Sequence, residues 1–297
     1  MDPRPTEIKI PFKGGETCPC GLNKRYDECH GSGKNPPISP FHFELPASST
    51  GKQVNGCYMS SLQDCDGALS LEHYISQSIL KQFDIIRGEG LQGNLDELPS
   101  IPIKALAVRV LCQRHNALLS DLDTRAGLAF ERIRTIQQHM IKPIANRRKV
   151  RDCLIDGYAL ELWAAKSLLA TYVGKVARTN GQPTIDVKKL NVDAVVKRIA
   201  AGRLEPPFGL YMHKGPRFTK RTVSAGALTD GDQVVGIRMQ LGQLGFDCIV
   251  APAQRLDPAN YRPCAAIYWN KASFNGNLFI AWDGPKRNDW VYSEELD

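Results

Sequence analysis

The residues best suited to chemistry in this 297-residue sequence are two groups of cysteine and histidine. The first group, Cys18, Cys20, Cys29 and His30, lies in the stretch CPCGLNKRYDECHG. Three thiolates and one imidazole are a standard ligand set for tetrahedral zinc. So short a stretch has no hydrophobic core, so metal binding would have to supply its folding energy. Unrelated surface cysteines are the alternative, and a redox pair is disfavoured because the Cys-x-x-Cys spacing is absent.

The second group is spread over a longer part of the chain. Cys57 and Cys65 would form one half of a zinc site, and the compact pair Cys112-x-x-His115 the other half. The spacing from Cys57 to Cys65 is longer than is usual for such sites, so a loop that merely carries two cysteines is the alternative. The other three cysteines stand apart and are expected to be small apolar residues or unreactive thiols: Cys153, Cys248 and Cys264.

An acid, a histidine and an amide accompany the second group: Glu72, His73 and Asn116. A carboxylate and an amide oxygen can hold a hard ion such as Mg²⁺ or Mn²⁺. A neighbouring neutral imidazole can then deprotonate water for attack on a phosphodiester. The structural alternative is a partly buried His73 at the start of a helix, with Glu72 exposed in its first turn.

The first group resembles a known zinc-binding motif. Cys-Pro-Cys-Gly, Lys-Arg-Tyr and Cys-His-Gly, within residues 18–31, are similar to the SEC-C motif. That motif occurs at the tail of the bacterial preprotein-translocase motor and as an addition to many unrelated proteins. The resemblance implies a structural zinc ion and docking to a protein partner, and it implies no reaction.

The second group resembles the zinc-stabilised HNH endonucleases. The resemblance rests on the pattern Cys…Cys…Glu-His-x-Ile-Ser followed by Leu-Cys-x-x-His-Asn. The resemblance implies a ββα-metal unit with a structural zinc ion on Cys57, Cys65, Cys112 and His115. It also implies that His73 is the general base and that Glu72 and Asn116 hold a catalytic Mg²⁺ or Mn²⁺.

The chain departs from the HNH pattern in three ways. Glu72 stands where the pattern commonly has Asp, and Ser76 stands where it usually has proline. The middle asparagine of the pattern has no clear equivalent, and Asn94 is only a weak candidate for it. The function expected from this resemblance is metal-dependent hydrolysis of DNA phosphodiester bonds. The alternative is a non-catalytic zinc-binding platform for nucleic acid or protein partners, with a degenerate HNH-like site.

The elements around these residues predict an α+β fold. Apolar residues at steps of three and four, among them Phe130, Ile133, Ile136 and Met140, predict helices over 123–177, with Trp163 and Tyr172 in the core. Short β-branched and aromatic runs after about residue 205 predict an antiparallel sheet, with a hairpin connection at NKASFNGN. We therefore expect a zinc knuckle at 8–33, a linker at 34–55, an HNH-like zinc unit at 56–125, a helical segment at 126–204 and a β-rich domain at 205–297.

Charge and composition set limits on partners and location. The chain is 42% hydrophobic and 23% charged, as expected of a globular protein, and its net charge of +7 permits an anionic partner such as DNA. No apolar run reaches the length of a membrane span, and the N-terminus lacks a secretory signal, so a cytoplasmic location is expected. Thiols stay reduced there, which argues against disulfides. Nucleotide-binding glycine loops are absent from the sequence.

Two basic stretches are candidates for contacts with DNA phosphates. The first contains Arg147, Arg148 and Lys149, and the second contains Lys214, Arg217 and Lys220. Each cationic side chain that neutralises a phosphate would add salt-dependent affinity. A solvated helix end for the first stretch and an exposed loop for the second are the alternatives.

Overall fold

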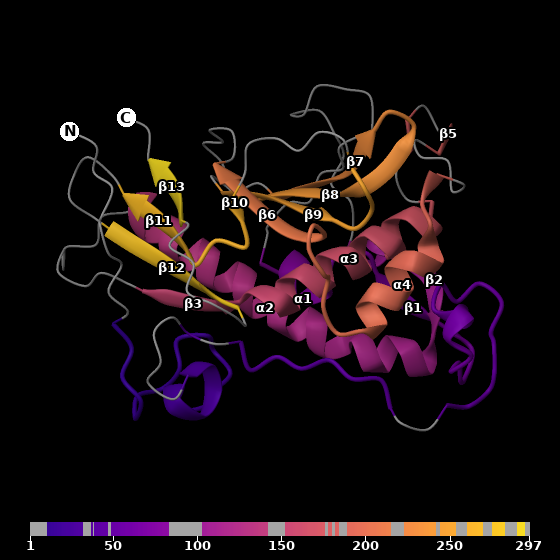
Figure 1. Cartoon of the computed structure of the whole chain (residues 1–297), viewed down its shortest axis with the longest axis horizontal. Coiled ribbons are helices and arrows are strands. Elements are labelled where there is room, and N and C mark those ends of the chain that lie inside the picture. Colours follow the sequence, from indigo (N-terminus) through magenta and orange to yellow (C-terminus); the bar gives the residue numbers. More distant parts are fainter. Residues whose placement is uncertain are drawn as a thin grey trace.

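Two helices form the centre of the computed structural model (Figure 1). α2 (Gln113–Ile141) is amphipathic, and its buried residues Leu122, Phe130, Ile133 and Ile136 recur at helical spacing. α3 (Gly157–Val173) is buried over almost its whole length, as expected of a helix that is largely apolar on all sides. The two helices pack together through an edge-on contact of Phe130 with Trp163, whose ring centroids are 5.2 Å apart.

The structure describes residues 11–31, 37, 39–46, 49–82, 103–141, 152–175, 178–179, 182–183, 189–214, 223–241, 244–253, 260–269, 275–282 and 290–294. The helices within these ranges are α1 (Gln77–Leu80), α2 (Gln113–Ile141), α3 (Gly157–Val173) and α4 (Val192–Ala200), with shorter helical turns at Asp27–Gly31, Ser60–Leu62 and Ile103–Leu106. None of these helices combines the length and apolar character needed to cross a membrane.

A five-stranded antiparallel sheet covers one side of α3. Its order is β10-β6-β9-β8-β7, and its strands are β6 (Gly209–Lys214), β7 (Val223–Asp230), β8 (Gln233–Leu241), β9 (Leu244–Ile249) and β10 (Asn260–Tyr261). Phe246 of β9 contacts Phe130 edge-on, and their ring centroids are 6.5 Å apart. A buried ion pair also fastens the sheet to α3, since Glu161 accepts hydrogen bonds from Arg262 Nε at 2.9 Å and from the Leu210 amide at 2.8 Å.

A four-stranded mixed sheet lies beside the first, at the left in Figure 1. Its order is β13-β11-β12-β3, and its strands are β3 (Cys153–Asp156), β11 (Ala265–Trp269), β12 (Asn275–Ala281) and β13 (Trp290–Glu294). β11 and β12 pair in antiparallel fashion across the expected hairpin, whereas the two outer strands pair in parallel with their neighbours. The expected sheet was antiparallel throughout, so these parallel pairs are a correction.

β3 also interrupts the helical region expected over 123–177. Its sequence CLID is a buried four-residue run, and so short an apolar run has no periodicity that separates a strand from a helix. Pairing with β12 decides the conformation, because Leu154 and Ile155 lie opposite Phe279 and Ile280. The expected burial of Trp163 and Tyr172 is confirmed.

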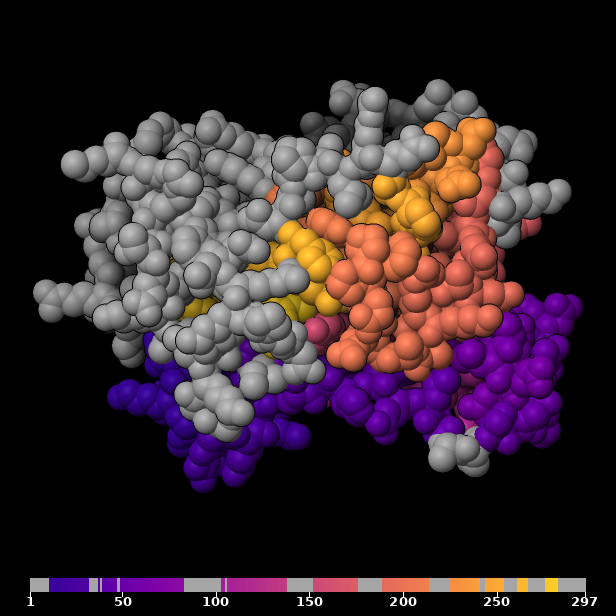
Figure 2. Space-filling view, in the orientation of Figure 1, coloured from indigo at the N-terminus to yellow at the C-terminus, as the bar shows by residue number. Residues whose placement is uncertain are grey.

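A small antiparallel sheet precedes α2 and carries the HNH-like residues. It consists of β1 (Leu69–His73) and β2 (Ala107–Cys112), and its register shifts between Ser70 and Glu72. A further short pair is β4 (Arg178–Thr179) with β5 (Gln182–Pro183). The molecule is thus a mixed α+β structure with several small sheets. The segments coloured indigo to purple, within residues 11–82, lie along the lower edge in Figure 2. From this part of the chain, Phe41 packs into the main core.

Candidate metal centres

The first Cys/His group forms a buried cluster. One ligand atom from each of Cys18, Cys20, Cys29 and His30 lies within 4.8 Å of the others. A bridge between Thr17 and Arg25 and a positive φ of 90° at Gly21 fold the first pair back toward the second. The helical turn Asp27–Gly31 then brings the second pair inward.

The distances in this cluster match a shared tetrahedral ion. Cys20 Sγ and Cys29 Sγ are 3.6 Å apart, and Cys18 Sγ is 3.3 Å from His30 Nδ1. Zinc bonds of about 2.3 Å to sulfur and 2.0 Å to nitrogen, set at tetrahedral angles, place two sulfurs about 3.8 Å apart and sulfur and nitrogen about 3.5 Å apart. The sulfurs are too distant for a disulfide bond.

Electrostatics in the first cluster also favour a cation. Hydrogen bonds from Cys18 and Cys29 lower the pKa of the Cys20 thiol far below its ordinary value. Burial alone would lower the pKa of His30, but the sulfurs of Cys20 and Cys29 outweigh burial and raise it to about 9. In the metal-free cluster the negative charge on sulfur is therefore balanced by a protonated imidazole, and zinc would have to displace that proton on binding.

The first cluster is packed against the body of the protein. Its cysteines and Tyr26 form a small hydrophobic core together with Leu154, Phe279 and Ala281 of the four-stranded sheet. Phe12 bridges the two parts, with ring centroids 5.4 Å from Tyr26 and 5.2 Å from Phe279. A side chain at Gly21 would collide with Arg132 of α2, so the knuckle also fits closely against that helix.

The second Cys/His group forms an equally buried cluster from three separate segments. The ligand atoms of Cys57, Cys65, Cys112 and His115 lie within 4.8 Å of one another. His115 Nδ1 faces the three sulfurs, at 3.4 Å from Cys57, 3.7 Å from Cys65 and 3.2 Å from Cys112. Cys112 is the last residue of β2, and His115 lies in the first turn of α2.

Protonation in the second cluster suits the same metal. Burial lowers the pKa of His115, which keeps the imidazole neutral as zinc binding requires. Burial also raises the pKa of the Cys57 thiol to about 12, so a bound cation is needed to keep this sulfur ionised. Both clusters are therefore compatible with structural zinc ions, each bound by three cysteines and one histidine.

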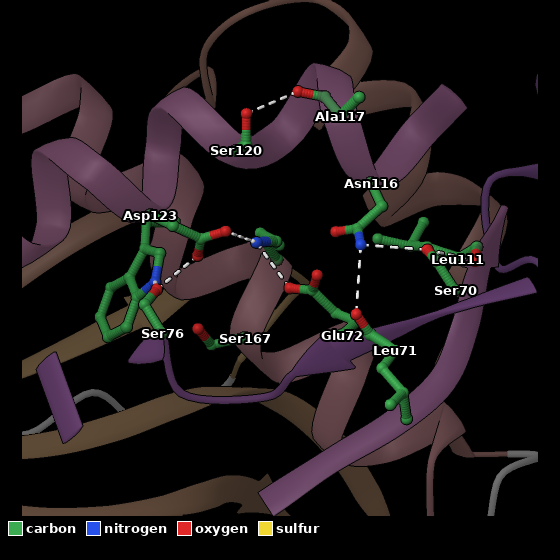
Figure 3. A network of polar contacts seen from close by, with 12 residues as sticks. Ser70, Leu71, Glu72, Ser76, Leu111, Asn116, Ala117, Ser120, Asp123 and Ser167 are labelled. Carbon is green, nitrogen blue, oxygen red and sulfur yellow. Dashed lines mark hydrogen bonds and ion pairs between the residues drawn. The ribbon is translucent and has the colours of Figure 1, made fainter. Parts of the chain in front are cut away.

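The structure places Glu72 neither as a metal ligand nor as an exposed acid in a helix, the two roles considered from the sequence. It is part of β1 and only 4% exposed, so the alternative of an exposed acid in the first turn of a helix is wrong. Its Oε1 lies 2.6 Å from the ammonium of Lys166, which is 1% exposed and also contacts Asp123. The carboxylates of Glu72 and Asp123, both labelled in Figure 3, thus share this one ammonium.

Further hydrogen bonds complete this buried cluster, which we call the Lys166 cluster and define as Glu72, Ser76, Asp123, Trp163 and Lys166. Ser76 donates to Asp123 Oδ1 and accepts from Trp163 Nε1 at 2.6 Å. Burial raises the pKa of Glu72 although Lys166 counteracts the shift. The cluster joins β1, α2 and α3, and it places one ammonium between two carboxylates.

Asn116 and His73 lie near the Lys166 cluster but do not bond to each other among the described residues. Asn116 Nδ2 donates to Ser70 Oγ at 3.0 Å and to the Leu71 carbonyl at 3.2 Å. In Figure 3 its side chain faces that of Glu72. His73 Nε2 is buried and has no hydrogen-bond partner in the described part of the chain, and burial lowers the pKa of this imidazole.

The residues around Glu72 do not fit a divalent ion as they stand. The Lys166 ammonium occupies the position facing the Glu72 carboxylate that a metal ion would use. Within the described ranges, the two Cys₃His groups are the places where three or more potential ligands of the Cys, His, Asp and Glu types converge. No catalytic metal site is evident there.

Several predicted residues lie outside the described ranges: Asn94, Arg147, Arg148, Lys149, Arg217 and Lys220. Lys214 ends β6, and its side chain is not described. Lys166 is the important residue that sequence reasoning missed. Lys166 is the one lysine in the otherwise mostly apolar stretch LELWAAKSLLATY. Because a buried lysine needs a partner, this pattern could have indicated a buried ion pair.

No protein-family model, curated protein or solved structure matches this chain. The chemistry of the two clusters therefore rests on their own geometry.

Proposed function

We propose that this chain is a zinc-stabilised DNA-binding protein in which the HNH-like residues form a structural cluster instead of a nuclease centre. The observation that carries this proposal is the 2.6 Å contact between Lys166 Nζ and Glu72 Oε1, with both residues buried. A catalytic ion on Glu72 would have to displace the ammonium. Displacement would break one of the two carboxylate contacts of the buried Lys166 and leave only Asp123 as its partner, and breaking a buried ion pair is destabilising.

DNA is the partner favoured by charge. The net charge of +7 provides long-range attraction to a polyanion. The two basic stretches at 146–151 and 213–221 concentrate part of this charge. The zinc clusters would then serve to hold the fold together and not to cut.

A plasmid-nicking assay tests the non-catalytic part of the proposal. Zinc-loaded protein is incubated with supercoiled DNA in Mg²⁺, Mn²⁺ or EDTA, beside His73→Ala and the control His42→Ala, whose imidazole is at the surface. We expect no metal-dependent nicking by any of the three. Nicking that requires added metal, disappears in His73→Ala and persists in His42→Ala would overturn the proposal.

Fluorescence anisotropy with a labelled duplex tests DNA binding. We expect log K to fall linearly with log salt concentration, by about 0.9 for each phosphate neutralised. Replacing Arg147, Arg148 and Lys149 by alanine should weaken binding and reduce the slope by about 2–3. The control replaces Lys13, Lys104 and Lys197, three exposed lysines that remove the same charge elsewhere. Equal losses in both triple variants would contradict a defined contact surface.

The second candidate function is a metal-dependent HNH-type endonuclease. It is favoured by Asn116 and Glu72 facing each other and by the lowered pKa of His73, which keeps that imidazole neutral as a general base requires. In this function Glu72 and Asn116 would hold Mg²⁺ or Mn²⁺ after Lys166 withdraws.

Electron paramagnetic resonance of added Mn²⁺ separates the two functions independently of turnover. A nuclease would bind one Mn²⁺ per zinc-loaded chain and lose it in Glu72→Gln. The DNA-binding function predicts no bound Mn²⁺ at this position in either protein.

A further inference from the structure

Asp156 lies where three parts of the molecule meet. It is the last residue of β3 and the N-cap of α3, and it is 8% exposed. Its Oδ1 accepts a hydrogen bond from the Ala159 amide at 3.0 Å, and its Oδ2 accepts one from Ser39 Oγ at 2.8 Å. Oδ2 also lies 3.9 Å from Arg125 Nη1 of α2.

The same carboxylate oxygen faces a ligand of the first cluster. Asp156 Oδ2 is 3.9 Å from His30 Nε2, and both side chains are buried. The opposite ring nitrogen, Nδ1, faces the cysteine sulfurs, at 3.3 Å from Cys18 Sγ. His30 Nε2 has no hydrogen-bond partner among the described residues.

Zinc binding would leave a buried N–H on His30 Nε2 that needs a hydrogen-bond acceptor. A neutral imidazole that gives Nδ1 to a metal carries its proton on Nε2. A buried N–H of this kind requires an acceptor. Outer carboxylates commonly meet that requirement for metal-bound histidines, fix the ring orientation and raise ligand basicity.

We propose that Asp156 is the positioning residue of the first zinc cluster, accepting the Nε2–H of His30 when zinc is bound. Ser39 holds the carboxylate in place for this contact. Because the same carboxylate caps α3, zinc in the knuckle is coupled to the start of the central helix.

The second cluster provides an internal reference. His115 Nε2 is also buried and unpartnered among the described residues, but it has no comparable carboxylate contact there. Asp64, which lies nearby, is engaged by Arg114 Nε at 3.1 Å and by the Thr50 amide at 2.9 Å. A variant that acts through Asp156 should therefore change the first cluster and leave the second unchanged.

Asp156→Asn in the full-length protein is the main test. The amide oxygen of asparagine still caps a helix, so α3 keeps its start while the charge facing His30 is lost. Zinc is withdrawn with increasing chelator, exposed thiols are alkylated with N-ethylmaleimide, and peptides are analysed by mass spectrometry. Cys18, Cys20 and Cys29 report the first cluster, and Cys57, Cys65 and Cys112 report the second.

We expect the zinc affinity of the first cluster to fall about 10–100-fold in Asp156→Asn, with the second cluster unchanged. The matched control is Asn191→Ala, which removes the cap that Asn191 gives the Ala194 amide at 3.0 Å in α4. That variant should leave both clusters unchanged. Unchanged protection of the first cluster in Asp156→Asn, equal loosening of both clusters, or the same effect in Asn191→Ala would each overturn the proposal.

Ser39→Ala decides the matter if Asp156→Asn does not fold. It keeps the carboxylate and the α3 cap but removes the hydrogen bond that orients Oδ2. The expected result is a smaller loss of zinc affinity, confined to the first cluster. No change in that cluster, or an equal change in both, would contradict the role of Asp156.

Discussion

The two Cys₃His clusters contain the same kinds of candidate zinc ligand but depend on the fold to different extents. All four ligands of the first come from residues 18–30, whereas those of the second come from three segments that include the end of β2 and the start of α2. The first packs in a small core against one sheet, and the second is part of the main core. A locally assembled cluster can close before the rest of the chain folds, but a dispersed one closes only as the rest folds.

Cys112→Ser should give the largest effect, because it removes a fully buried ligand at the junction of β2 and α2. Structural zinc contributes on the order of 10 kcal/mol to folding in small domains, which is comparable to the whole stability of a typical protein. We expect loss of cooperative unfolding and of near-ultraviolet circular dichroism. A cooperatively folded variant with one zinc ion would show that the main core forms without this cluster.

Cys20→Ser should have a smaller effect on the whole protein. The knuckle loses its metal and its own fold, while the main core keeps its zinc and its helix packing. We expect one zinc ion per chain by native mass spectrometry, a cooperative melt at lower temperature, and trypsin cleavage after Lys24 or Arg25. If this variant is as unfolded as Cys112→Ser, the contrast between a local and a dispersed cluster is wrong.

Phe279→Ala tests the docking of the knuckle without touching a ligand. Phe279 is 2% exposed and contacts Phe12 edge-on. Truncating a buried phenylalanine costs about 3–5 kcal/mol. We expect this loss in chemical unfolding, together with faster alkylation of Cys29 but not of Cys65. Equal protection of both thiols would mean that the sheet does not hold the knuckle.

Asp64→Asn should give the smallest effect, and one that depends on pH. Burial alone would raise the pKa of Asp64, but hydrogen bonds from Arg114 and Thr50 outweigh it and lower the pKa. A carboxyl with a lowered folded pKa adds stability above its ordinary value of about 3.9, and this stability is lost as the pH falls through the folded pKa. The stability difference between wild type and variant should thus be present at pH 7 and vanish in acid. Chemical unfolding across pH measures it, and a difference that persists in acid would contradict it.

The sequence made the metal ligands predictable to the extent that their signal is local. Closely spaced cysteines and histidines restrict a short segment to few arrangements, so Cys18, Cys20, Cys29 and His30 could be grouped without a structure. Cys112 and His115 are similarly compact. The division of the chain at residues 33, 55, 125 and 204 stays a prediction.

The Lys166 cluster and Asp156 could not be predicted because their partners are distant in the sequence. Lys166 contacts Glu72 from β1 and Asp123 from α2, and nothing in the residues near any one of them indicates the others. Asp156 lies in a stretch for which the sequence predicts a helix, and its position beside His30 depends on how the knuckle docks. Strand pairing in parallel, as for β3 with β12, is equally non-local.

The contact of the knuckle with β12 has a consequence for biosynthesis. A ribosome makes residues 12–30 about 250 residues before it adds Phe279 and Ala281, on which the knuckle rests. At about 5–20 residues per second, the interval between them is on the order of tens of seconds. During that interval the apolar face of the nascent knuckle, including Phe12 and Tyr26, has no sheet to cover it. The growing chain would therefore expose an apolar surface that chaperones can recognise until β12 has been made and can cover it.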